Sequence, residues 1–261
     1  MILRRIAEHL RHQHWTAVWI ELVIVILGVF IGTQVSNWNE SRHEDARARE
    51  ALARIQADLQ TDLRSIELRR AFWPKVNDYG RAAIHYAETG ELVQASAWKT
   101  VLAFYQASQL WPWVTNDSTY QELRSAGELG LIRDKHLRAD LTMYYAEASG
   151  TNVGYILAFQ PDYRRIVRGL TPAVASDQVW ANCWVQPSQT EQRLIDCPSP
   201  MPEAEAQAQA VLDGYLKDPR LLGELRFWMA NQGVALNVIG NTRKLDLAIL
   251  AKIQAAERAS R

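Results

Sequence analysis

The sequence predicts an all-α protein in which one N-terminal transmembrane helix continues into a long stalk helix and packs in an extracytoplasmic helical bundle. Three observations support this prediction: a twenty-residue apolar run near the N-terminus, helical spacing of apolar residues along most of the remaining chain, and very few alternating β patterns. Apolar residues make up 48% of the 261 residues, which excludes a disordered or low-complexity chain. Basic and acidic residues number 29 each, so no net charge favours nucleic acid as a partner.

Residues 16–35 form the candidate membrane span, with Glu21 as their only ionisable residue. In helical form, twenty residues at about 1.5 Å per residue cover the roughly 30 Å hydrocarbon layer of a bilayer. Tryptophan favours the headgroup level. The predicted interface anchors are Trp15, Trp19 and Trp38. We therefore expect a transmembrane helix over 15–38; a buried soluble helix and a cleaved signal are the alternatives, and no Ala-x-Ala cleavage site follows the apolar run.

The charges that flank the span predict its orientation. Residues 1–14 carry three arginines and three histidines, whereas acidic and basic residues are mixed after Trp38. Basic flanks stay in the cytoplasm. The sequence therefore predicts a cytoplasmic basic tail over 1–14 and an extracytoplasmic helical domain over 39–261.

One face of the predicted span is suited to packing against another helix. Glu21, Gly28 and Gly32 fall on one stripe at 100° per residue. Two glycines one turn apart allow close approach of a second helix in lipid. We expect this face to contact a second copy of the chain or another membrane protein, and Glu21 either takes part in that contact or reaches the near interface as a snorkelling side chain.

Cys183 and Cys197 are the two cysteines of the chain, and both lie in a Pro-rich segment, 171–202, that is expected to be a loop. Two cysteines exclude a four-cysteine zinc site. Outside the cytoplasm they could form a disulfide that closes a loop of about 15 residues and contributes about 3 kcal/mol. The alternative is two unrelated thiols.

Helical spacing and capping signals divide the predicted extracytoplasmic part. The apolar stripe after Trp38 predicts that the stalk continues to about residue 72, and Pro74 would then open a second helix that Gly90 ends. Further starts are expected at Ser96, at a capping box from Thr119 to Glu122, at Asp134, and at Pro202 or Pro219. A final helix, 233 to about 258, is long enough to pack back along the stalk.

Few residues suggest chemistry. An aromatic cluster is a candidate ligand surface, although an aromatic core between helices explains it as well. Its members are Trp98, Tyr105, Trp111 and Trp113. The histidines lack the spacing of a zinc protease, and no nucleophile elbow, phosphate loop or dinucleotide motif occurs, so no metal site or cofactor is predicted. Glu122, Glu128 and Asp134 are candidate catalytic carboxylates that helix capping explains equally well.

Two segments resemble a known protein family. The span ending in Asn37-Trp38-Asn39-Glu40 and the block from Ser118 to Tyr145 are similar to a bacterial family of single-span membrane proteins of unknown function. The resemblance covers roughly the first fifth of the chain and one central block. It implies a bacterial inner-membrane protein with a periplasmic helical domain, and it implies no activity.

These observations predict a membrane-anchored binding or interaction module that assembles through its span. Its expected partners are the lipid bilayer, a second copy or another membrane protein, and a small ligand remains open. The alternative is an envelope-associated hydrolytic enzyme that uses unidentified carboxylates, and a third reading is a simple tether. A cavity with two convergent acids of raised pKa would favour the enzyme, whereas an exposed apolar groove would favour binding.

Overall fold

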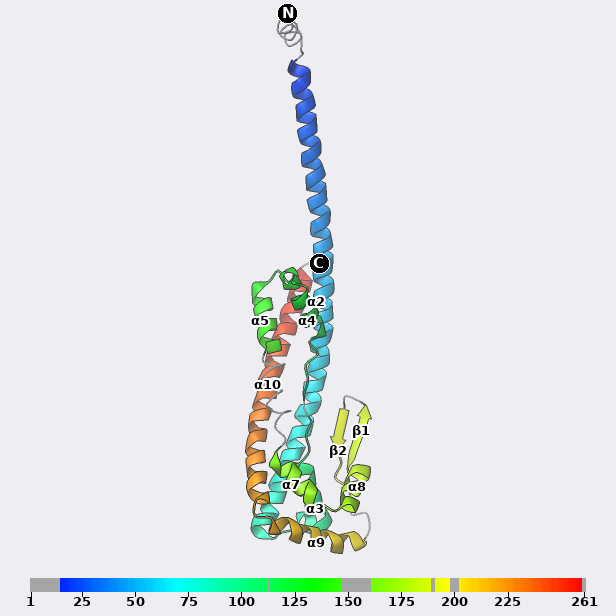
Figure 1. The fold of residues 1–261 in the computed structure, drawn as a ribbon, viewed down its shortest axis with the longest axis vertical. Helices are drawn as coiled ribbons and strands as arrows, with labels where there is room; N and C mark the ends of the chain where they lie inside the picture. The colour runs from blue at the N-terminus through cyan, green and yellow to red at the C-terminus, as the bar shows by residue number, and fades with distance from the viewer. Residues whose placement is uncertain (1–14, 112, 147–160, 189–190, 198–201, 260–261) are drawn as a thin grey trace, which may run out of the picture. The chain divides into compact units, whose positions relative to one another are not determined.

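The computed structural model describes residues 15–111, 113–146, 161–188, 191–197 and 202–259. These residues form eight α-helices, two short 3-10 helices and one two-stranded sheet (Figure 1), which confirms the predicted all-α class. The chain divides into two units, Met1–Ala51 and Leu52–Arg261, and each is described by itself below.

The helices and strands are labelled as in Figure 1. The longer helices are α2 (Trp15–Thr89), α9 (Pro202–Lys217) and α10 (Leu221–Ala259), and the shorter ones are α3 (Ala97–Ala107), α4 (Ser118–Ser125), α5 (Lys135–Ala146), α7 (Asp162–Leu170) and α8 (Ala173–Asn182). The 3-10 helices are η1 (Val93–Ala95) and η2 (Glu128–Leu131), and the strands are β1 (Trp184–Ser188) and β2 (Glu191–Leu194).

The first helix does not end where the sequence predicts. Helix α2 runs through Pro74 to Thr89, so the expected break and second helix at Pro74 are wrong. An interior proline removes one backbone hydrogen bond and costs about 3 kcal/mol. Phe72, Trp73 and Val76 around it are buried, and burying each such side chain stabilises the helical path by roughly 1.5–3 kcal/mol. Packing therefore outweighs the local preference of the proline.

Several predicted helix ends are confirmed. Gly90 ends α2 with a positive φ of 76°, a conformation that glycine adopts without strain. The Ser96 hydroxyl caps α3 by accepting the Lys99 N–H at 3.1 Å. Asp134 caps α5 by accepting the N–H groups of His136 and Leu137 at 2.8 and 3.2 Å. The predicted continuation of this helix beyond Ala146 lies outside the described residues.

Helix α10 packs antiparallel along α2 within the second unit. Arg226 pairs with Glu88 near the end of α2, and Arg243 pairs with Glu67 farther back. The prediction that the last helix returns along the stalk is confirmed, although this helix begins at Leu221, earlier than residue 233. Between these two ion pairs, the rings of Trp73 on α2 and Trp228 on α10 lie with their centroids 6.2 Å apart.

Helix α3 lies at the centre of the second unit. All its residues except Lys99 are buried. It packs against α9, α7 and η1. Because a helix that is apolar all round must be covered all round, α3 is the core element on which the shorter helices assemble.

The Pro-rich segment is not a loop throughout. Residues 171–202 were expected to lack regular structure, but they contain α8 and the antiparallel strands β1 and β2. Trp184 pairs with Leu194 and Val185 with Arg193. Both strands are edges of a two-stranded sheet, so a proline in β1 is tolerated there.

Candidate functional site

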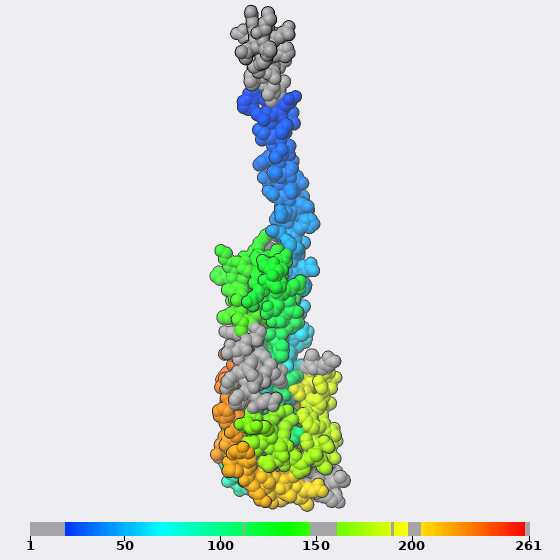
Figure 2. Space-filling view, in the orientation of Figure 1, coloured from blue at the N-terminus to red at the C-terminus, as the bar shows by residue number. Residues whose placement is uncertain are grey.

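The apolar part of α2 in the first unit is the candidate membrane contact. Its most apolar 18-residue window has a mean hydropathy of 1.9, and none of that window is buried. Figure 2 shows this part of the helix uncovered on the visible face. The segment is long and apolar enough to cross a membrane, and it is the one such helix among the described residues.

The glycine face of this segment is open. A Cβ atom added at Gly28 or at Gly32 would meet no atom within 4 Å. Glu21 is exposed on the same helical stripe. The three predicted packing residues therefore share one accessible strip, and a second helix could approach its backbone closely.

The predicted interface anchors are exposed where they are described. Trp19 is 63% exposed and Trp38 is 62% exposed. The guanidinium of Arg42 lies 4.8 Å from the centre of the Trp38 ring, a cation–π contact. The side chain of Trp15 lies outside the described residues. An amphipathic ring with an arginine one turn later suits the polar boundary of a bilayer.

The predicted aromatic ligand surface is wrong, because its members are buried. Trp98, Tyr105, Trp111 and Trp113 are 1–8% exposed. Indole and phenol rings bury 150–250 Å² each, roughly, and so contribute most when covered. Two arginines complete the packing: Arg69 lies over Trp111 at 4.5 Å, and Arg168 lies over Tyr105 at 5.0 Å.

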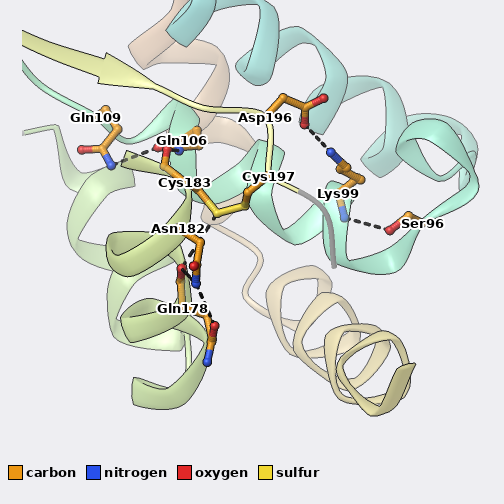
Figure 3. Close-up of a disulfide and its surroundings, with 9 residues drawn as sticks. All are labelled: Ser96, Lys99, Gln106, Gln109, Gln178, Asn182, Cys183, Asp196 and Cys197. Carbon is orange, nitrogen blue, oxygen red and sulfur yellow. Dashed lines mark hydrogen bonds and ion pairs between the residues drawn. A yellow bond between two sulfur atoms is a disulfide. The ribbon is translucent and has the colours of Figure 1, made fainter. Parts of the chain in front are cut away.

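Cys183 and Cys197 form the predicted disulfide, with their Cα atoms 5.1 Å apart (Figure 3). Both cysteines are buried. The Gln106 side-chain amide of α3 donates to the Cys183 carbonyl at 2.8 Å, and Lys99 pairs with Asp196 at 2.6 Å. The bond closes the segment that holds the hairpin, and these contacts fix the closed segment on the central helix.

One groove lies between α2 and the hairpin. It has a volume of about 170 Å³. Its lining comes from Leu68, Ala71, Phe72 and Lys75 of α2 and from Glu191–Leu194 of β2. Typical small-molecule pockets are roughly 300–1,000 Å³. The groove contains none of the residues that the sequence singled out, and it is small for a ligand site.

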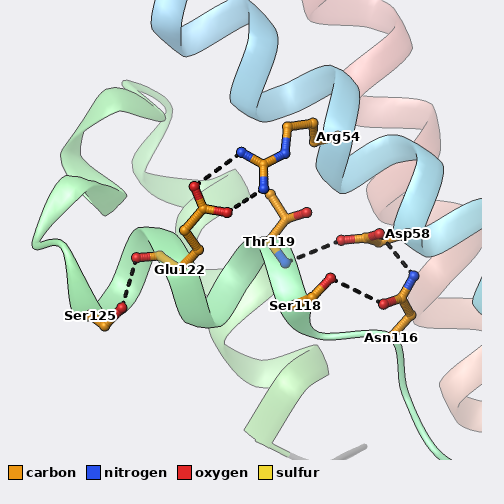
Figure 4. A network of polar contacts seen from close by, with 7 residues as sticks. All are labelled: Arg54, Asp58, Asn116, Ser118, Thr119, Glu122 and Ser125. Atoms are coloured by element: carbon orange, nitrogen blue, oxygen red, sulfur yellow. Dashed lines mark hydrogen bonds and ion pairs between the residues drawn. The ribbon is translucent and has the colours of Figure 1, made fainter.

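The three candidate carboxylates each lie in a different local setting. Glu122 is exposed and pairs with Arg54 of α2, which lowers the pKa of Glu122 (Figure 4). Asp134 caps α5. Glu128 begins η2. The expected capping box from Thr119 to Glu122 is also wrong, because α4 begins at Ser118, before Thr119, and Glu122 pairs with Arg54.

The start of α4 is capped from a different helix. Asp58 of α2 accepts the Asn116 side-chain amide at 2.8 Å and the Thr119 N–H at 3.4 Å (Figure 4). One turn later, Asp62 accepts the Asn116 backbone N–H at 2.8 Å. Two acids of α2 thus supply hydrogen-bond acceptors that α4 does not provide for itself.

The sequence analysis missed Asp62 and Asp246, the two acids whose pKa values are raised most among the described residues. Asp62 is 1% exposed and also accepts the Tyr144 hydroxyl at 2.9 Å. Burial raises the pKa of Asp62 to about 6, although its two hydrogen bonds oppose the rise. Asp246 is fully buried, and burial together with the charge of Asp62 raises the pKa of Asp246 to about 7.

The sequence does contain a pattern that indicates burial of these two acids. Asp62 continues the buried series Ile55, Leu59 and Ile66, and Asp246 continues the series Ile239, Thr242, Ile249 and Ile253. An ionisable residue at a core position of a helical stripe is rare without a partner or a role. The signal is weak because it depends on where the stripe is drawn. If either stripe is drawn one residue farther along the chain, the acid falls at the edge of the stripe and its burial is no longer predicted.

No metal site is found in the part of the chain that the structure describes, where no three histidine, cysteine or acidic side chains gather suitably. His85 lies 3.1 Å from Glu91 at the surface. The histidines of the predicted tail lie outside the described residues.

No family model, curated protein or solved structure matches this chain. The resemblance to the bacterial single-span family stays a hypothesis.

Proposed function

We propose that this protein is a membrane-anchored helical interaction module. Its span assembles with a second copy or another membrane protein, and its second unit, outside the cytoplasm, binds a protein or small ligand. The observation that carries the proposal is the uncovered apolar stretch of α2 with its open glycine face. Exposed apolar surface of this extent is unfavourable in water and favourable in lipid.

The proposed orientation places residues 1–14 in the cytoplasm and 39–261 outside it, in the periplasm of a bacterium. The basic flank supports this orientation. The disulfide supports an oxidising compartment for the second unit, since such bonds are rare in the cytosol.

A hydrolytic enzyme is the second candidate, and the raised pKa values of Asp62 and Asp246 favour it. A general acid must come within hydrogen-bond reach of its substrate. Asp62 and Asp246 are 1% and 0% exposed, and the groove between α2 and β2 is lined by neither. We therefore place the interaction module first.

Two experiments test the proposal. A reporter that is active only outside the cytoplasm, fused after Arg261, should give signal, and the same reporter fused before Met1 should be silent. The reverse pattern would invert the proposed topology.

Crosslinking in native membranes tests assembly. Gly28→Leu and Gly32→Leu should each reduce crosslinked species several-fold, because a leucine side chain separates the two backbones. Val23→Phe, which adds bulk to the opposite face of the helix, is the matched control and should leave crosslinking unchanged. Equal crosslinking in all variants would remove the glycine face from the proposal.

A further inference from the structure

Two buried carboxyl groups lie at the same level of the antiparallel pair α2 and α10. Arg243 contacts Glu67, so residues just after Arg243 lie beside residues just before Glu67. Asp246 follows the arginine by three positions, and Asp62 precedes the glutamate by five. The charge of Asp62 raises the pKa of Asp246, which agrees with this placement.

The surroundings of the two acids differ. Asp62 accepts hydrogen bonds from Asn116 before α4 and from Tyr144 of α5. Asp246 is fully buried, and neither of its oxygens has a hydrogen-bond partner among the described residues. A buried carboxylate without a donor is far less favourable than a neutral carboxyl. The uncharged form therefore belongs on Asp246 and the anion on Asp62.

The charged groups near the two acids are mainly negative. On α2, Asp58 adds negative charge, and Arg69, two turns away, attracts the charge of Asp62 while its guanidinium donates to Ser65. Asp117 adds negative charge from the segment before α4. The other groups facing Asp62 and Asp246 are the phenols of Tyr144 and Tyr145 on α5.

The basic residues of α10 are occupied elsewhere. Arg243 pairs with Glu67, and Lys252 pairs with Asp140 of α5. Among the described residues no ion pair reaches Asp62 or Asp246. A proton on one of them then removes the repulsion between two carboxylates that share a site.

We propose that Asp62 and Asp246 form a buried proton-binding site, occupied on Asp246 near neutral pH, and that loss of this proton loosens the packing of α5 and α10 against α2. The site binds a proton and no other ligand. Asp62 of α2 also accepts hydrogen bonds from Asn116 before α4 and from Tyr144 of α5. A negative charge on Asp246 of α10 would therefore disturb the contacts of α2 with the start of α4, with α5 and with α10. The proposal is independent of the membrane topology.

The direction of the pH effect follows from the raised pKa values of about 6 and about 7. In the unfolded chain an aspartate has a pKa of about 3.9, so between about pH 4 and about pH 7 the folded state binds more protons. Stability contributed by this site is therefore fully present in acid and is lost as the pH rises towards 7.

Denaturant unfolding of the full chain in detergent micelles at about pH 5 and about pH 8 tests the proposal. The folding equilibrium constant should fall on the order of tenfold to a hundredfold on going to the higher pH. Asp246→Asn removes the group of the site with the higher pKa and should remove most of this pH dependence, while Asp62 keeps the remainder. Glu122→Gln is the control. Pairing with Arg54 lowers the pKa of Glu122, so Glu122 does not titrate between about pH 5 and about pH 8 and its replacement should leave the full pH dependence in place.

Infrared spectroscopy gives a second measurement that does not depend on the stability of a variant. The wild-type protein near pH 6 should show the C=O stretch of a protonated carboxyl group, and this band should disappear at about pH 8. A wild-type stability that does not change with pH, an Asp246→Asn variant that keeps the pH dependence, or absence of the infrared band would each overturn the proposal.

Discussion

Helix α2 contains two stretches that bury apolar residues to opposite extents. In the first unit Leu27 and Val29 are 51% and 63% exposed, whereas in the second unit Ile55 and Leu59 are both fully buried. The first stretch is apolar on every face, and the second is apolar on one stripe with charges between. The two stretches differ in the periodicity of their apolar residues rather than in apolar content alone. A helix with one apolar stripe buries that stripe against protein, whereas a helix that is apolar on every face is favourable in lipid.

The largest expected effect comes from one substitution made in both stretches. Leu59→Ala should lower the free energy of unfolding of the second unit by about 2–5 kcal/mol, because it removes a buried side chain and leaves a cavity. Leu27→Ala should leave that free energy unchanged. Denaturant unfolding followed by tryptophan fluorescence measures both. A comparable loss in the two variants would contradict the distinction between the stretches.

The hairpin of β1 and β2 is a part of the second unit that buries few apolar residues, so we expect the disulfide to contribute much of its stability. In β1 and β2 only Leu194 is buried. Replacing Cys183 and Cys197 together by serine should destabilise the domain by about 3 kcal/mol, since the closed loop has about 15 residues. Thermal unfolding with and without reductant measures the effect, and reductant should not change the melting of the double variant. An unchanged melting temperature would show that α3 holds the hairpin without the bond.

The smallest expected effect concerns the half-exposed ion pair between α10 and α2. Arg243→Met keeps most of the aliphatic length of the arginine and should cost about 1 kcal/mol or less, because solvent screens the pair. Unfolding at low and high salt measures this, and the wild type should approach the variant as salt increases. A loss of several kcal/mol would mean that the charge also serves the nearby acid pair.

The sequence predicted the helices that carry local signals. Gly90, Ser96 and Asp134 act as caps because each satisfies backbone groups within a few residues of itself. Pro74 misled the prediction, since the packing of Trp73 and Val76 around it is invisible locally. The hairpin was missed because its strands are short and lack alternation.

The candidate sites also divide into those that local helical geometry predicts and those that depend on tertiary packing. Glu21, Gly28 and Gly32 share a stripe that follows from helical geometry alone. Burial of Trp98 and Trp113, which removes the proposed ligand surface, depends on which helices cover α3. The acid pair needs α10 to return along α2 in one register, and no local pattern sets that register.

The amino-acid sequence by itself determined the all-α class, the apolar span and the cysteine pair, because periodicity, length and composition act over a few turns of chain. Only the tertiary structure decided that Asp62 and Asp246 are both buried in the core. The physical reason is that burial and charge repulsion depend on neighbours 184 positions apart in the chain, which local sequence does not encode.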